Sequence, residues 1–170
     1  DVGNDAVLDQ LRVLNGFDVD LAADLTRLTN RLRDSLVSVS PALERTVGAR
    51  LHQAGVRDLL AKFPTPTALR AAGRARITTA VKKRSPRVAA KVVDAVTAAL
   101  DAQSVTMPAE AAVGRVIAEL AVELDRIHAR RDALAAEIEE VFLAHPFGQV
   151  LVTLPGIGPR TGARILAEIG

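Results

Sequence analysis

Several residue types that carry chemistry are absent or scarce in this sequence. It has no cysteine, tryptophan or tyrosine, and only four phenylalanines and three histidines. Without cysteine there is no disulfide, thiolate metal site or thiol nucleophile. The three histidines do not stand at metal-ligand spacing, and no serine has a neighbouring base, which argues against metal and nucleophilic catalysis. Four phenylalanines are too few for a base-stacking platform, so we do not expect binding of single strands by stacking.

Long apolar runs are also missing. No run approaches the roughly 18 residues that a membrane-spanning helix needs, so no membrane partner is expected. The first five residues do not resemble a signal peptide, and a soluble cytoplasmic protein is therefore expected. Of the 170 residues, 49% are hydrophobic and 25% charged, which is typical of a folded chain. Much of the apolar share is alanine, which favours helices.

Acidic residues are missing from one segment, 63–93, although the net charge of the whole chain is only +2. The basic residues of this segment are Arg70, Arg74, Arg76, Lys82, Lys83, Arg84, Arg87 and Lys91. Such a local excess of positive charge indicates a polyanionic partner, with nucleic-acid phosphates as the first candidate. A solvated helix face is the alternative. We assign contact with the nucleic-acid backbone to Arg74, Arg76, Lys82, Lys83, Arg84, Arg87 and Lys91.

Two heptad patterns predict two long helical arms. In segment 7–39 the apolar steps alternate between four and three residues, with Asp18 and Ser35 as polar interruptions and Gly16 as a possible kink. A second pattern fills 108–144, starts near Pro108 and is interrupted at Arg131. The similar lengths favour one antiparallel hairpin, and pairing of each arm with another copy is the alternative. Asp18 and Arg131 fall on seam positions, where single polar residues can set register or partner choice.

Shorter helices are expected between the arms, at 49–63, 66–72, 75–83 and 86–103. Gly73 reads as a helix stop, and Ser85-Pro86 reads as an N-cap with proline in the first turn. No alternating strand pattern occurs, so the chain is predicted to be all-α. The expected parts are a first coiled-coil arm (1–40), a basic helical insert (41–105), a second arm (106–145) and a helix-hairpin-helix (146–170).

The C-terminal motif Leu154-Pro155-Gly156-Ile157-Gly158-Pro159 resembles the helix-hairpin-helix family of DNA-binding motifs. A short helix at about 147–153 would enter a tight turn that both glycines permit, with Ile157 plugged between the helices. The free N–H groups of the turn and of the next helix could then hold a phosphate oxygen. We expect close packing at the unusual Gly162, and we assign DNA contact to Gly156, Ile157, Gly158, Arg160, Thr161 and Arg164. The alternative is a turn that only packs two helices.

Segment 81–93 aligns without gaps on 154–166. Pro86 and Arg87 match Pro159 and Arg160, and Lys91 matches Arg164. We interpret this segment as a degenerate helix-hairpin-helix in which side-chain cations replace the backbone turn, although such a match also arises by chance in an alanine-rich chain.

Five strings in order resemble the IS-one-ten family of bacterial insertion-sequence transposases: 11–21, 30–33, 40–45, 63–76 and 154–159. The resemblance covers essentially the whole chain. It implies a parent protein with an N-terminal RuvC-like domain whose acidic residues bind metal, a coiled-coil region, and a C-terminal domain with a nucleophilic serine. Family members recombine DNA under the guidance of a structured RNA.

This sequence matches only the middle of that plan. It ends at Gly170, before the expected serine, and Asp1 and Asp5 do not fit the acidic motif. We therefore expect a non-catalytic piece of a transposase without a cofactor of its own, while the RuvC-like domain would use Mg²⁺. Its expected partners are DNA, a structured guide RNA and further copies of itself through the coiled coil. The alternative is a structural coiled-coil module that binds no nucleic acid.

Overall fold

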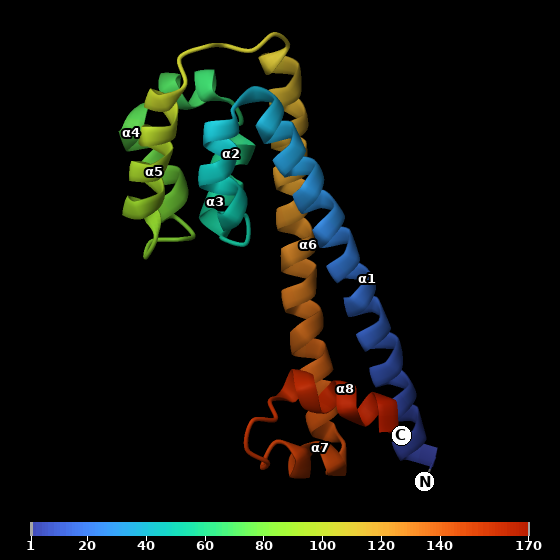
Figure 1. Cartoon of the computed structure of the whole chain (residues 1–170). Helices are drawn as coiled ribbons and strands as arrows, with labels where there is room; N and C mark the ends of the chain where they lie inside the picture. Colours follow the sequence, from blue (N-terminus) through green and yellow to red (C-terminus); the bar gives the residue numbers. More distant parts are fainter. Residues whose placement is uncertain (1, 170) are drawn as a thin grey trace. The chain divides into compact units, whose positions relative to one another are not determined.

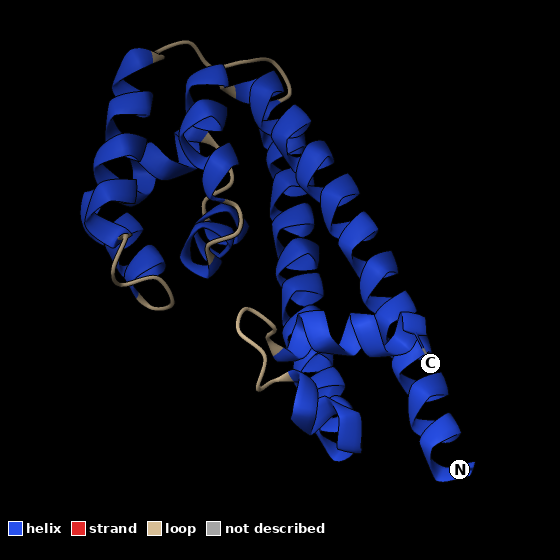
Figure 2. Ribbon diagram, turned by 60° about the horizontal axis from the view of Figure 1, so that its bottom comes forward, coloured by secondary structure: helices blue, strands red, loops and turns tan. Residues whose placement is uncertain are grey.

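A computed structural model describes residues 2–169 and confirms the all-α prediction, since no strand occurs among these residues (Figure 2). Asp1 and Gly170, both named in the sequence analysis, lie outside the described residues. The α-helices are α1 (Val2–Val39), α2 (Pro41–Val47), α3 (Ala54–Lys62), α4 (Pro66–Lys82), α5 (Ala89–Ala102), α6 (Glu110–Ala144), α7 (Pro146–Leu151) and α8 (Pro159–Ile169). A short 3-10 helix, η1 (Gly48–Arg50), follows α2. Within the described range, no helix is long and apolar enough to cross a membrane.

The chain divides into two compact units. Among the described residues, unit 1 holds 2–25 and 127–169, and unit 2 holds 26–126. In each unit one part of α1 lies beside one part of α6 (Figures 1 and 2). The start of α1 shares unit 1 with the end of α6, so the arms pair antiparallel within one chain.

The heptad pattern identified most of the residues buried between the arms. On α1 these are Leu11, Asp18, Leu21, Leu28, Leu32 and Val39, and on α6 they are Ile117, Leu120, Leu124, Ile127, Leu134 and Ile138. Leu36 is buried, whereas the neighbouring Ser35 binds its own helix through the Arg31 carbonyl. The kink expected at Gly16 is absent, because α1 continues through it.

The second arm begins later than predicted. Pro108 precedes the helix, because Ala109 has a φ of +63° and a right-handed helix cannot include it. The carboxylate of Glu110 then accepts hydrogen bonds from the backbone N–H and the hydroxyl of Thr67, both at 3.0 Å. Glu110 thus caps the start of α4, where unpaired N–H groups and the helix dipole favour a negative charge.

Unit 2 also contains a helix that the sequence analysis missed. Ser40-Pro41 ends the first arm and at the same time starts α2, because the Ser40 hydroxyl accepts the Leu43 N–H at 3.1 Å. Gly73 interrupts α4 with a φ of +75°, as expected of a helix stop. The fourth predicted helix starts three residues late, at Ala89, and Ser85 does not cap it.

Phe142 is the centre of the α7–α8 packing in unit 1. Its side chain is fully buried. A Cβ added to Gly162 would lie 2.5 Å from the ring, and a Cβ added to Gly148 would collide with the Phe142 carbonyl. The close packing expected at Gly162 is therefore present, since both glycines let backbone approach the phenylalanine directly.

Candidate nucleic-acid interface

Apart from Arg84, the basic residues of segment 63–93 divide into two groups. In the first, a carboxylate, backbone carbonyls and an aromatic ring of unit 2 supply partners. Arg74 pairs with Asp94, and Arg70 donates to the carbonyls of Leu100 and Gln103 at the end of α5. The Arg76 guanidinium lies 5.2 Å from the centre of the Phe63 ring. Although segment 63–93 contains no acidic residue, an acidic residue from outside the segment therefore contacts it.

The second group has no ion-pair partner among the described residues. It consists of Lys82, Lys83, Arg87 and Lys91, which we call the basic cluster. All four are exposed, at the end of α4, in the turn 83–88 and in the first turn of α5. The turn 83–88 is called the basic turn below.

Helix stability explains only half of the basic cluster. Lys82 and Lys83 lie at the C-terminus of α4, where a cation stabilises a helix. Arg87 and Lys91 flank the N-terminus of α5, where a cation opposes the helix dipole. This helix start has no side-chain cap and no acidic residue in its first turn. An external anion would satisfy both the cations and the N–H groups at this helix start that have no backbone acceptor among the described residues.

Arg84, assigned to phosphate contact from the sequence, is paired with carboxylates of unit 2, although 40% of its side chain is exposed. Its Nη1 donates to Asp58 at 2.8 Å and to Asp125 at 3.0 Å. Arg57 also donates to Asp125, at 2.8 Å, and only 5% of its side chain is exposed. Two arginines and two aspartates thereby join α3, α6 and the basic turn.

The electrostatics of this network follow from its pairing. Hydrogen bonding to Asp125, and then to Asp58, raises the pKa of Arg84 above its ordinary value. Desolvation by burial acts to raise the pKa of Asp125, but hydrogen bonds from Arg84 and Arg57 outweigh it and the pKa is lowered. Both shifts favour the charged forms of Arg84 and Asp125 at neutral pH.

The basic turn has a second attachment, through Ser85. The Ser85 hydroxyl accepts the Gly55 N–H at 2.9 Å, and the Ser85 N–H donates to the Val81 carbonyl at 2.9 Å. A Cβ added to Gly55 would collide with the Val81 carbonyl and would lie 2.8 Å from the Cβ of Ser85. The turn thus rests directly on the backbone of α3.

The C-terminal turn, residues 152–158, is built from backbone. Gly156 has a φ of +82°, and the Ile157 N–H donates to the Leu154 carbonyl at 3.2 Å. With Pro155 second and Gly156 third, this is a type II β-turn. Two details differ from the prediction: Ile157 uses its N–H within the turn, and Gly158 does not have a positive φ. Ile157 is half-buried.

The N-terminus of α8 offers backbone donors. Pro159 occupies its first position, and the Gly162 N–H bonds to the Gly158 carbonyl. Within the described residues, the N–H groups of Arg160 and Thr161 have no acceptor, and the first turn of α8 has no acidic residue. An anion from solution could therefore bind to these N–H groups and to the Arg160 side chain.

Arg164 is partly engaged within unit 1. Asp18, on α1, accepts from Arg131 at 3.0 and 3.3 Å, and Arg164 lies 3.6 Å from the same carboxylate. The hydrogen bond from Arg131 is the main cause that lowers the pKa of Asp18, although burial opposes it. The two polar seam residues thus pair with each other and join α1 to α6, while Arg164 joins α8 to the same carboxylate on α1.

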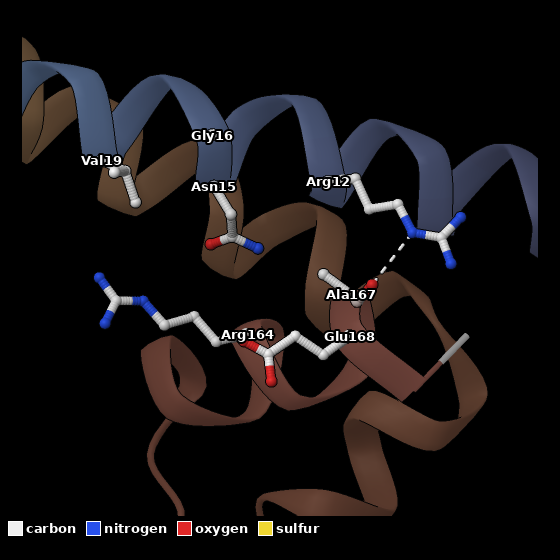
Figure 3. A pocket seen from close by; sticks show the side chains of 7 residues that line it. All are labelled: Arg12, Asn15, Gly16, Val19, Arg164, Ala167 and Glu168. Carbon is white, nitrogen blue, oxygen red and sulfur yellow. Dashed lines mark hydrogen bonds between the residues drawn. The ribbon is translucent and has the colours of Figure 1, made fainter.

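Further contacts between α1 and α8 border an open pocket of about 330 Å³ (Figure 3). Arg12 donates to the Ala167 carbonyl at 3.0 Å, and Asn15 donates to the Ala163 carbonyl at 3.4 Å. A cation on the last carbonyls of a helix stabilises that end. These bonds fix α8 within unit 1.

The internal match between 81–93 and 154–166 does not extend to the structure. Pro159 starts α8, but the matching Pro86 lies in a turn three residues before α5. The gapless alignment of 81–93 on 154–166 therefore does not place the second helices at matching positions, and the degenerate helix-hairpin-helix stays a prediction. In the part of the chain that the structure describes, no group of three His, Cys, Asp or Glu could hold a metal ion.

Comparison with known proteins identifies relatives over nearly the whole chain. The 43.6 kDa protein of insertion element IS110 from Streptomyces coelicolor is 42% identical over 98% of this chain and 41% of its own length. The chain is a homologue of insertion-element proteins. The 44.8 kDa protein of IS116 from Streptomyces clavuligerus is 35% identical over 94% of the chain, and the 42 kDa protein of IS900 from Mycobacterium paratuberculosis 32% over 98%.

The match with a fourth relative covers a shorter part of the chain. This relative is named as a candidate transposase of the Streptomyces coelicolor mini-circle IS117 and is 41% identical over 36% of the chain. The chain spans about two fifths of the length of the three longer matches. No family model matches it, and no solved structure does so significantly. The resemblance drawn from the sequence is confirmed as homology.

Proposed function

We propose that this chain is the coiled-coil and connecting region of a DNA transposase, and that it binds the nucleic-acid backbone through the basic cluster. The N-terminus of α8 provides a second contact. Homology with insertion-element proteins supports a role in transposition. The observation that most supports nucleic-acid binding is the basic cluster itself, which consists of four exposed cations without a partner in the described part of the chain.

The binding proposed here reads the backbone and not the base sequence. Lysine, arginine and free N–H groups bind phosphate oxygens, and such contacts position a protein without reading bases. Duplex DNA is the expected partner, and a structured guide RNA offers the same phosphate chemistry. Copies of the chain would associate through outer faces of the arms, because the seam residues are already buried within one chain.

The test uses fluorescence anisotropy with a labelled DNA duplex and a structured RNA, from about 50 to 200 mM salt. Binding should weaken steeply as salt rises. A quadruple variant, Lys82→Gln, Lys83→Gln, Arg87→Gln and Lys91→Gln, should lose about 3 to 4 units of the log–log salt slope if every cation contacts a phosphate.

A matched control removes the same charge elsewhere in unit 2. Four exposed arginines of unit 2 that form no ion pair within the described part of the chain are each changed to Gln: Arg31, Arg45, Arg115 and Arg126. This control should keep most of the affinity and slope. Equal losses in both variants would mean unspecific attraction by net charge, and no binding by the wild-type protein would favour a purely structural coiled-coil module.

The α8 contact is tested separately. Arg160→Gln should lower the salt slope by about one unit, since Arg160 forms no ion pair within 4.0 Å among the described residues and acts on Asp18 only through its charge. Arg164→Gln should lower it less, because Asp18 already holds that guanidinium. Light scattering on the same samples measures the oligomeric state.

A further inference from the structure

We propose that Arg84 is a positioning residue for the basic turn and does not itself contact phosphate. This inference rests on the proposed function and assigns separate tasks to neighbouring cations. Arg84 and Ser85 attach the turn to α3 and α6, while Lys82, Lys83 and Arg87 on either side project into solvent.

The geometry separates Arg84 from its neighbours. Its Nη1 is shared between two carboxylates, and both accept it at ordinary hydrogen-bond distance. A phosphate would have to displace Asp58 or Asp125 to gain a bond from the same nitrogen. Asp125 is held in place by the buried Arg57. The neighbouring Lys83 and Arg87 have no such competitor among the described residues.

Fixing the turn has a direct consequence for binding. A flexible turn with several long cations loses side-chain and backbone freedom when it binds, and that loss weakens affinity. Gly55 contributes by its lack of a side chain, because a Cβ there would collide with Val81 and Ser85. The turn is therefore ordered before any nucleic acid arrives.

The experiment compares salt slopes of variants whose net charge is matched. Arg84→Gln combined with Asp58→Asn leaves the net charge unchanged and keeps the Arg57–Asp125 pair. Gly55→Ala moves the turn without touching any charge. Both should weaken duplex binding about tenfold at fixed salt with an unchanged slope, because the number of phosphate contacts stays the same. Lys83→Gln, a contact variant, should lower the slope by about 0.9.

Controls separate this effect from loss of folding. Gly16→Ala adds a methyl group into open space on α1 and should leave binding unchanged. Ser85→Ala is a milder second variant that removes only the acceptor of the Gly55 N–H. Circular dichroism checks helicity, and hydrogen exchange at the amides of residue 55, Ser85 and Val88 should accelerate in Gly55→Ala if the turn has been released.

Two outcomes overturn the inference while the proposed function stands. A slope lowered by about 0.9 in the Arg84→Gln, Asp58→Asn variant would mean that Arg84 contacts phosphate. Unchanged affinity in Gly55→Ala, with accelerated exchange in the turn, would mean that order in the turn does not matter for binding. If the wild-type protein binds neither duplex nor RNA, the proposed function itself fails and the role of Arg84 in binding fails with it.

Discussion

The C-terminal turn and the basic turn both lead into a helix that begins with cations, but different parts of the chain hold them. The C-terminal turn owes its shape to backbone: a positive φ at Gly156 and close approach at Gly148 and Gly162. The basic turn owes its shape to side chains, with Arg84 and Ser85 bonded to other helices. A backbone-built turn can expose N–H donors, whereas a side-chain-built turn can expose several cations at once.

The largest expected effect breaks the packing behind the C-terminal turn. Phe142→Ala should lower the free energy of unfolding by about 3–5 kcal/mol, because the removed ring leaves a cavity between Gly148 and Gly162. Urea unfolding measures the change. Phe17→Ala is the control, since Phe17 is 41% exposed and should cost far less. A small effect at Phe142 would mean that the turn does not depend on this packing.

The corresponding test behind the basic turn is Arg57→Ala. Removal of a buried arginine leaves Asp125 with Arg84 alone, and we expect a loss of about 2–3 kcal/mol in unfolding free energy. The pKa of Asp125 should then rise, because one of the hydrogen bonds that lower it is gone. Urea unfolding and NMR titration of the carboxyl measure these changes. An unaltered pKa of Asp125 would contradict the network.

Asp18→Asn tests the ion pairs that join α1 to α6 and to α8. We expect a loss of about 1–2 kcal/mol at pH 7. The pKa of Asp18 is lowered in the folded state, so its stabilisation is present above the unfolded pKa of about 3.9 and is lost as pH falls through the folded pKa. The wild-type and variant stabilities should therefore converge on acidification. A difference that stayed constant with pH would exclude this explanation.

Gly156→Ala acts on the turn alone, and its expected effect on stability is no larger than that of Asp18→Asn. A φ of +82° is strained for alanine, and we expect about 1–2 kcal/mol of destabilisation. Gly16→Ala, in the middle of α1 and facing open space, should instead stabilise by about 0.5–1 kcal/mol. Thermal unfolding of both variants shows whether the sign changes with φ, as the comparison requires.

Local patterns predicted most elements of this fold, but not α2. The heptads identified both arms, and Gly73 and Gly156 marked the two breaks with positive φ. The starts of α5 and α6 were misplaced, because Pro86 and Pro108 resemble first-turn prolines in sequence. At Ala109, a positive φ that no local rule requires delays the helix.

The candidate site was predictable only in part, because sequence does not reveal partners from distant segments. The run of cations could be seen in the sequence. It could not be seen that Arg84 pairs with Asp125, which lies more than forty residues away. Asp18 and Arg131 were visible as two seam exceptions, and their pairing over 113 positions was not. Arg57 and Gly55 carried no local signal at all.

The most direct test of the account is the salt slope of duplex binding for the basic-cluster variant against its charge-matched control. If the basic cluster contacts phosphates, the variant with Gln at 82, 83, 87 and 91 should have a slope about 3 to 4 units smaller than that of the wild-type protein. The variant with Gln at 31, 45, 115 and 126 should have a nearly unchanged slope. Equal slopes in the two variants would contradict this account, since position in the structure would then not matter and only net charge would.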